Sequence, residues 1–161
     1  MQLGKAPVYA ILATLYVAKN GSRGPIQGRT IADAYGIPAE YLLKILQQLA
    51  RAQIVQSERG PRGGFRLRKL PAETTLLEIV EAVDGAISGE LRIHQSALVG
   101  ERMTRPIEKL CRDSAHFTRD LLRRASIELL IDSESAAPDT ARPGSEWRDR
   151  PPITPPLPLP S

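Results

Sequence analysis

The sequence predicts a mainly α-helical fold with a small β-hairpin wing, that is, a winged helix-turn-helix domain followed by a long dimerisation helix. Three patterns predict it: two short helical segments around a glycine at residues 30–51, a basic and glycine-rich hairpin at 54–69, and an apolar helical stripe at 106–131. The expected division is the winged domain at 1–85, a sensor or linker segment with the long helix at 86–132, and a disordered proline-rich tail at 133–161.

The first expected helix covers residues 7–19. Val8, Ile11, Leu12 and Leu15 recur at helical spacing and predict the side that packs under the following helices. Residues 20–28 are rich in glycine, which favours a loop.

The helix-turn-helix pattern depends on two residues that mark the end of one helix and the start of the next. Gly36 follows a short helical segment at 30–35 and suits a left-handed turn, and Pro38 suits the first turn of a new helix. In that second helix one stripe is apolar (Leu42, Ile45, Leu46 and Leu49), and the opposite face is polar (Glu40, Lys44, Gln47, Gln48 and Arg51).

The polar face suits the major groove of DNA, where lysine can reach guanine acceptors or phosphate, glutamine can bond adenine, and a carboxylate can accept from cytosine. The early positions, 39–44, should lie deepest in the groove. Periodicity alone is equally compatible with an ordinary amphipathic helix whose polar side faces water.

The next segment, residues 54–69, decides in favour of a nucleic-acid reader. Its glycines and Pro61 enforce turns, and Phe65 and Leu67 alternate with Arg66 and Arg68, as in a half-buried strand. Arg59 and Arg62 would lie at the hairpin tip, where arginine can enter the minor groove and neighbouring glycines, Gly63 among them, allow close approach to phosphates. A hairpin whose arginines merely face water is the less favoured alternative.

Basic charge is concentrated in the same region. Residues 1–70 carry 11 Lys/Arg and three Asp/Glu, a net charge of +8, whereas the rest of the chain carries 11 and 15, a net charge of −4. The two parts give the overall +4. Neutralising phosphates and releasing their counterions would then supply affinity for double-stranded DNA.

After the wing, Thr75 and Glu78 have the spacing of a capping box, which predicts a helix over residues 76–84 that ends at Gly85. The long helix expected at 106–131 carries an apolar stripe: Ile107, Leu110, Cys111, Ser114, Phe117, Leu121, Leu122, Ala125 and Leu129. Pairing with a second copy would bury this stripe and give a two-fold homodimer. Folding back onto its own domain is the alternative.

These segments resemble the Rrf2-type bacterial transcriptional regulators, which are dimeric winged-helix proteins. The resemblance rests on TIADAYGIPAEYLLKILQQLARAQIVQSERGPRGGFRL and the following LLEIVEAVDG. It implies major-groove contacts by Ala39, Glu40, Tyr41 and Lys44 and a minor-groove contact by Arg59. From its place on the polar face of the same helix, Gln48 is expected to join the major-groove contacts. Several members have a carboxylate where this chain has Leu43 and a serine where it has Pro38, so the operator is not transferable.

Many members also hold an iron–sulfur cluster with three cysteines. This chain has one cysteine, Cys111, so a conventional cluster is not supported and no cofactor is expected. We interpret Cys111 as a buried packing residue, with a redox-sensing thiol as the minority view. His94 and His116 are lone histidines without metal-ligand spacing.

Residues 86–103 lie where the family places its sensor. Arg92, His94, Gln95, Glu101 and Arg102 could line a site for a small-molecule or protein effector, but a plain connecting segment is favoured. The tail at 133–161 is rich in proline and should be disordered.

Other classes are disfavoured. No apolar run approaches a membrane span, the N-terminus has no signal-peptide plan, and a single cysteine fits a reducing cytoplasm, with nucleoid association when DNA is bound. No P-loop, dinucleotide fingerprint, GxSxG or metal cluster indicates an enzyme. Two classes remain: a sequence-specific regulator, most simply a repressor, and a winged-helix module that binds a partner protein instead of DNA.

Overall fold

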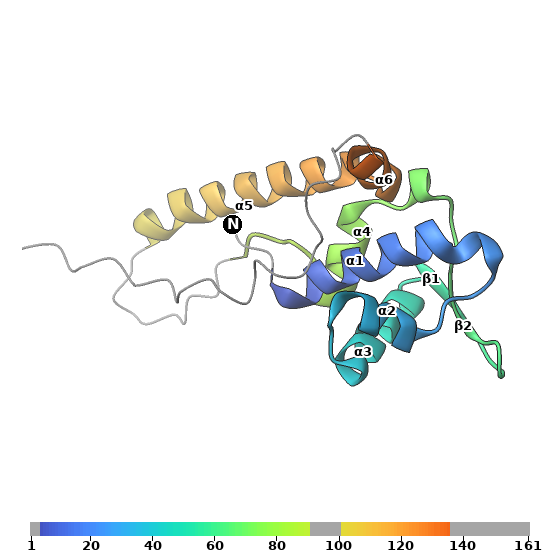
Figure 1. Ribbon diagram of the computed structural model, residues 1–161. Coiled ribbons are helices and arrows are strands. Elements are labelled where there is room, and N and C mark those ends of the chain that lie inside the picture. Colours follow the sequence, from blue (N-terminus) through green and yellow to red (C-terminus); the bar gives the residue numbers. More distant parts are fainter. Residues whose placement is uncertain (1–3, 91–100, 136–161) are drawn as a thin grey trace, which may run out of the picture.

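The computed structural model describes residues 4–90 and 101–135, which form a helical head with a projecting two-stranded hairpin and a long outlying helix (Figure 1). The elements are α1 (Lys5–Asn20), η1 (Gly21–Arg23), α2 (Gly28–Tyr35), α3 (Ala39–Arg51), β1 (Val55–Glu58), β2 (Gly64–Leu67), η2 (Pro71–Glu73), α4 (Leu76–Asp84), α5 (Glu101–Arg124) and α6 (Ile127–Ser135). None of the helices in the described residues is long and apolar enough to cross a bilayer.

The helix-turn-helix forms as the sequence predicts, except that Pro38 precedes α3 as its N-cap residue instead of lying in its first turn. Gly36 ends α2 in the left-handed conformation (φ 63°, ψ 30°), which a residue with a side chain adopts at a cost. The N–H groups of Gly36 and Ile37 both donate to the carbonyl of Ala32, so the corner is closed by backbone hydrogen bonds. The apolar stripe of α3 is buried in the core, as expected: Leu42, Ile45, Leu46 and Leu49.

The buried side of α1 differs from the prediction. The structure buries Pro7, Ala10, Ala13, Thr14 and Val17, whereas Val8 of the predicted stripe is 40% exposed. The physical reason is that α1 packs against α3 and α4 through small residues, which let helix backbones approach closely, while the larger Ile11 and Leu15 lie at the rim of the core. Thr14 is tolerated there because its hydroxyl donates to the carbonyl of Ala10 (2.8 Å).

The hairpin pairs β1 and β2 in antiparallel register, with Val55 opposite Leu67 and Glu58 opposite Gly64. Residues 20–28, expected as a loop, contain η1 and then join the hairpin through Ile26. The N–H of Ile26 donates to the carbonyl of Phe65 (2.9 Å), and the N–H of Phe65 donates to the carbonyl of Ile26 (2.8 Å). The buried Phe65 ring joins the wing to the core.

The long helix predicted at 106–131 is instead two helices. Helix α5 begins at Glu101 and ends at Arg124, and α6 begins at Ile127. The break arises because the backbone at Ala125 and Ser126 pairs with residues 74–76: the N–H of Leu76 donates to the carbonyl of Ala125 (2.8 Å), and that of Ile127 to the carbonyl of Thr74 (2.9 Å). Helix α6 extends to Ser135, past the predicted start of the tail at 133, and residues 136–161 lie outside the described residues.

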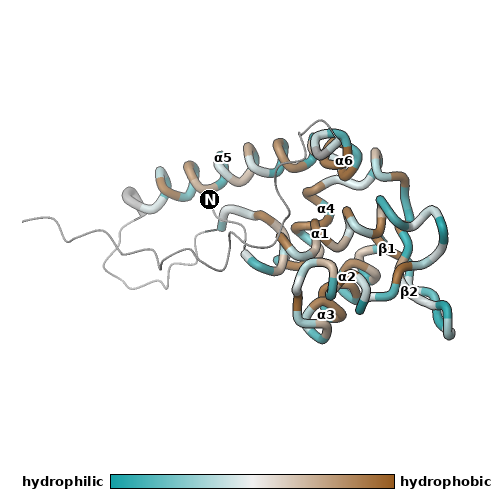
Figure 2. Tube along the Cα trace, viewed as in Figure 1, coloured by the Kyte–Doolittle hydropathy of each residue, from teal (hydrophilic) through white to brown (hydrophobic). Residues whose placement is uncertain are grey.

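Helix α5 is joined to the head at one end and lies on the other side of α1 from α3 (Figure 1). Arg119 of α5 forms an ion pair with Glu81 of α4, and the N–H of Ile87 donates to the same carboxylate (3.1 Å). Figure 2 shows that hydrophobic residues recur along α5 between hydrophilic ones. This pattern leaves much of the apolar stripe away from the head.

Candidate nucleic-acid interface

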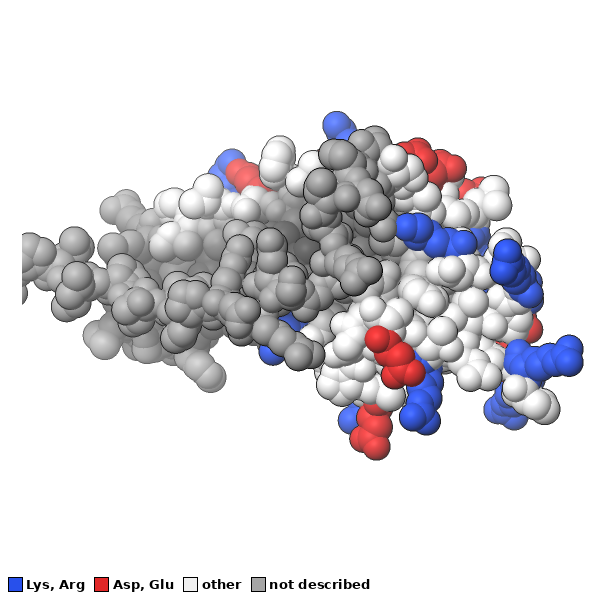
Figure 3. Space-filling view, viewed as in Figure 1, with Lys and Arg blue, Asp and Glu red and all other residues white. Residues whose placement is uncertain are grey.

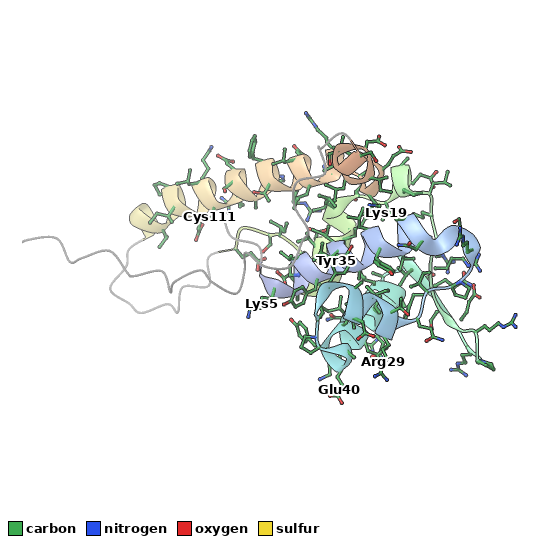
Figure 4. The ribbon with its side chains drawn as sticks, in the orientation of Figure 1. Lys5, Lys19, Arg29, Tyr35, Glu40 and Cys111 are labelled. Atoms are coloured by element: carbon green, nitrogen blue, oxygen red, sulfur yellow. The ribbon has the colours of Figure 1, made fainter. Side chains whose placement is uncertain are left out.

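The outer face of α3 carries the predicted major-groove residues. Ala39, Glu40, Tyr41 and Lys44 are exposed, and Gln48 is half-buried. They lie outside because the apolar stripe of the same helix faces the core. Figure 4 shows Glu40 pointing away from α1, at the same edge of the head as Arg29 from the first turn of α2.

Tyr41 is held by a neighbouring helix. Its ring meets the ring of Tyr9 of α1 edge to face, with centroids 5.9 Å apart and an interplanar angle of 80°. The side chain keeps 40% of its surface exposed. Its hydroxyl can therefore approach a DNA strand with little loss of side-chain entropy, because the ring is already positioned.

The wing presents its arginines on a five-residue loop between Glu58 and Gly64. Arg59 and Arg62 are both exposed, and neither forms an ion pair with any residue that the structure describes. At the base of the loop, Arg66 pairs with Glu58 (3.1 Å), so this carboxylate is engaged by a strand residue and not by the tip arginines. The tip is thus free to receive phosphate or groove contacts.

Gly63 is required by the loop geometry. A Cβ at this position would overlap the carbonyl oxygen of Glu58 and lie 2.9 Å from that of Gly60. The N–H of Gly63 donates to the Gly60 carbonyl (2.9 Å), and Gly60 itself has a φ of 115°. These two glycines turn the chain tightly, so that the arginines extend beyond the strands.

The charge of the head supports the same surface. Figure 3 shows Lys and Arg side chains projecting from the end of the head that carries the hairpin. The chain up to Leu70 has the net charge of +8 derived above. A surface with this balance attracts a polyanion in a salt-dependent manner.

Two exposed residues of this surface were not among the predicted contacts, although Leu43 had been noted as a departure from the family pattern. Arg29 lies in the first turn of α2, and Leu43 is 46% exposed on α3, between the predicted polar contacts. The signal for Leu43 was its spacing: it follows Glu40 by three residues and precedes Gln47 by four, which places it on their face. Sorting the helix by polarity alone concealed it.

The ligands needed for an iron–sulfur cluster are not assembled. The chain contains one cysteine, and the described residues contain no group of three His, Cys, Asp or Glu side chains that could hold a metal. Cys111 is half-buried on α5, not buried as predicted, and lines a shallow groove with Ile87, Gly89, Leu110, Ser114, Ala115 and Thr118. A cluster held by several thiolates of one chain therefore does not fit these residues.

The predicted effector residues Arg92, His94 and Gln95 lie outside the described residues, and the side chains of Glu101 and Arg102 are likewise not described. His116 is exposed on α5, far along the sequence from other candidate ligands. The small-molecule or protein effector thus stays a prediction.

The sequence is similar to known regulators. A family model described as "Rrf2: Iron-dependent Transcriptional regulator" matches residues 3–133. The BadM protein of Rhodopseudomonas palustris, named as an HTH-type transcriptional regulator, is 32% identical over 131 residues, which is 81% of each chain. The HTH-type transcriptional regulator IscR of Photorhabdus laumondii is 28% identical over 152 residues, which covers 94% of this chain and 92% of IscR.

Solved structures share the fold. CymR, the global cysteine regulator of B. subtilis, superposes with a TM-score of 0.67 at 22% identity and covers 83% of this chain and 98% of its own. The IscR of T. potens superposes with a TM-score of 0.64 at 22% identity and covers 91% and 96%. The shared fold therefore includes the long helix as well as the head.

Proposed function

Because this chain belongs to the Rrf2 family of transcriptional regulators, we propose that it binds a dyad-symmetric operator as a homodimer and represses transcription. In each half-site α3 lies in the major groove and the wing reaches the adjacent minor groove. The observation that carries the proposal is the pair of exposed tip arginines, which form no ion pair within the described part of the chain, on a head of net charge +8 that also exposes the polar face of α3.

The major-groove contacts come from the first two turns of α3. Lys44 donates to guanine acceptors or phosphate, Glu40 accepts from cytosine N4, and Tyr41 reaches the backbone from its packed position against Tyr9. Ala39 allows the helix to approach the bases closely, and the half-buried Gln48, one turn further along, contacts the DNA strand at the edge of the groove.

The minor-groove contact comes from Arg59, with Arg62 on the flanking phosphates. A narrow minor groove has an enhanced negative potential, so a guanidinium without an internal ion pair gains more from entering it than one already paired. Gly63 lets the loop backbone approach the sugar-phosphate strand.

The dimer is formed by the outward stripe of α5, which comprises Ile107, Leu110, Ser114, Phe117 and Leu121. These residues alternate at spacings of three and four, which is the heptad pattern of paired helices. All five are exposed, and Phe117 is exposed by 73%. The other apolar side of α5 faces its own head: Ala115 is buried, and Cys111, Thr118 and Leu122 are half-buried. Folding back therefore accounts for only one of the two sides.

We propose further that operator binding requires no iron–sulfur cluster, because the chain has one thiol. Metal-free protein should then bind its operator as well as protein reconstituted with iron and sulfide. The winged-helix module that binds only a protein partner is the competing function, and the uneven charge of the chain disfavours it.

The test is a selection of genomic DNA fragments by the metal-free full-length protein, at a stated near-physiological salt concentration. Arg59→Ala is compared with Arg112→Ala, which removes the same charge from α5, away from α3, the wing and the outward stripe. The native protein and Arg112→Ala should enrich one dyad-symmetric motif, and Arg59→Ala should bind it at least about tenfold more weakly, or ~1.4 kcal/mol.

Enrichment of no motif by the native protein would overturn the proposed function in favour of a protein-binding module. Equal binding by Arg59→Ala would remove the wing from the mechanism and leave α3 as the reader. Operators that overlap promoters, with raised transcription after deletion of the gene, are the expected mark of a repressor.

A further inference from the structure

One large apolar side chain of α3 points outward. Leu43 is 46% exposed, whereas the other leucines and the isoleucine of this helix are at most 1% exposed. Leu43 is not among the residues that pack against the hydrophobic core. The other large hydrophobic residue that α3 exposes, Tyr41, already has a partner in the ring of Tyr9.

Leu43 also lies within the face that would enter DNA. Glu40, Leu43, Lys44 and Gln47 stand at positions i, i+3, i+4 and i+7, which places them on one stripe of the helix, and all four are exposed. The recognition helix of a homeodomain uses side chains at this same spacing to touch base edges. A single exposed leucine is common on protein surfaces, so the inference depends on the position of Leu43 within this stripe.

We infer that Leu43 is a specificity-determining residue that packs against the C5-methyl group of a thymine in each half-site of the operator. This inference rests on the proposed DNA-binding function. Among the four bases only thymine presents an apolar group at the floor of the major groove, and small or aliphatic side chains recognise it by contact.

The other base edges are poor partners for a leucine. Adenine and cytosine would place an amino group against Leu43, and guanine two acceptors, and each would lose its hydrogen bonds to water without a replacement. The polar neighbours Glu40 and Lys44 fix the register of the helix along the groove, so Leu43 meets a defined base step.

The experiment measures binding of the full-length protein to its selected operator, with each thymine replaced in turn by deoxyuridine. This replacement removes the methyl group and keeps base pairing. One position per half-site should weaken binding of the native protein about fourfold, the value of one buried methyl group. The same replacement should not affect Leu43→Ala.

Leu70→Ala is the matched control, because Leu70 is an exposed leucine outside α3 and the wing loop. It should keep the native response to deoxyuridine. Since Leu43 does not contribute to the core, Leu43→Ala should unfold at the native temperature, which separates lost contacts from lost folding.

The outcomes distinguish the two proposals. If the native protein selects an operator and no thymine shows a methyl effect that depends on Leu43, the inference is wrong and the proposed function stands. If the native protein selects no operator, both fail together. A selection with Leu43→Ala that loses its preference for thymine at one position per half-site would support the inference independently.

Discussion

Gly64 is the residue at which the wing touches the body of the head. A Cβ at this position would overlap the carbonyl group of Ile26 and lie 2.9 Å from the N–H nitrogen of Gln27. The neighbouring Phe65 exchanges two backbone hydrogen bonds with Ile26, so neither strand can move aside without breaking them. The wing is therefore positioned by a contact that only glycine permits.

Gly64→Ala should lower the free energy of unfolding by about 1–3 kcal/mol, the usual cost of forcing extra atoms into a packed site. It should also weaken operator binding, because the tip arginines move with the strands. Chemical denaturation measures the first effect. Gly21→Ala is the control: its Cβ would meet only Val17, at 4.0 Å, so stability should change little. Equal stability of the two variants would contradict the prediction.

At the residue scale the sequence predicted which polar side chains of α3 and the wing are exposed, while their contacts with DNA stay predictions. The wing arginines followed from their glycine-rich setting, and Glu40 and Lys44 followed from the polar side of α3. Leu43 was noted as a departure from the family pattern but was left out of the contact residues, because those were chosen for their polar groups. Cys111 was predicted to be buried because the apolar residues of this helix were treated as one stripe. Helix α5 has two apolar sides, and Cys111 is half-buried on the side that faces the head.

At the scale of an element, two side chains determine where α4 begins. The Thr75 hydroxyl accepts from the N–H of Glu78 (3.3 Å), and the Glu78 carboxylate accepts from the N–H of Thr75 (3.2 Å). Lys69 donates to the same carboxylate (2.8 Å). Partial burial raises the pKa of Glu78, but the Lys69 ammonium and the Thr75 N–H outweigh it and hold the pKa below its usual value.

A carboxyl group with a lowered pKa stabilises the folded state at pH values above its ordinary pKa, and loses that contribution as the pH falls through the folded-state value. Glu78→Gln should therefore destabilise the protein by about 0.5 kcal/mol at neutral pH, as expected for a largely solvated pair, and by progressively less below about pH 4.5. Denaturation at several pH values measures this. Asp33→Asn, on α2, is the control, and a gap that persists in acid would contradict the assignment.

Elements were predictable where the signal is local. Thr75 and Glu78 predict the start of α4, and Gly36 predicts the end of α2. The buried side of α1 was not predictable from hydrophobicity, because close packing selected Ala10 and Ala13 over Leu12. The break after α5 had one local signal that the sequence analysis did not use: the Ser126 hydroxyl accepts from the N–H of Leu129 (3.2 Å), as an N-cap of α6. The pairing of this backbone with residues 74–76 is long-range and was not predictable.

At the scale of the whole molecule, the proposed dimer predicts that one substitution halves the mass of the protein in solution. Phe117→Glu places a charge in the middle of the outward stripe of α5 and should convert a dimer into a monomer, with little effect on unfolding because the side chain is exposed. The monomer should bind one half-site and lose affinity for the dyad. Analytical ultracentrifugation measures the mass.

His116→Glu is the matched control, because it introduces the same side chain at an exposed neighbouring position on another side of α5. It should leave the dimer intact. A native protein that is monomeric at micromolar concentration, or a Phe117→Glu variant that stays dimeric, would move the interface away from this stripe.

The joint between α5 and the head has a mechanical consequence. It includes main-chain hydrogen bonds at residues 74–76 and 125–127 and the ion pair of Glu81 with Arg119, and packing against Gly89 extends it along α5 as far as Cys111. The arm of α5 beyond Cys111 is about 15 Å long, so it amplifies rotation: a pivot of about 10° displaces its far end by about 3 Å. Read in reverse, a movement of that size between the far arms of two copies would turn each head only slightly. In the proposed dimer, such a tilt would change how the two α3 helices align with successive turns of a double helix.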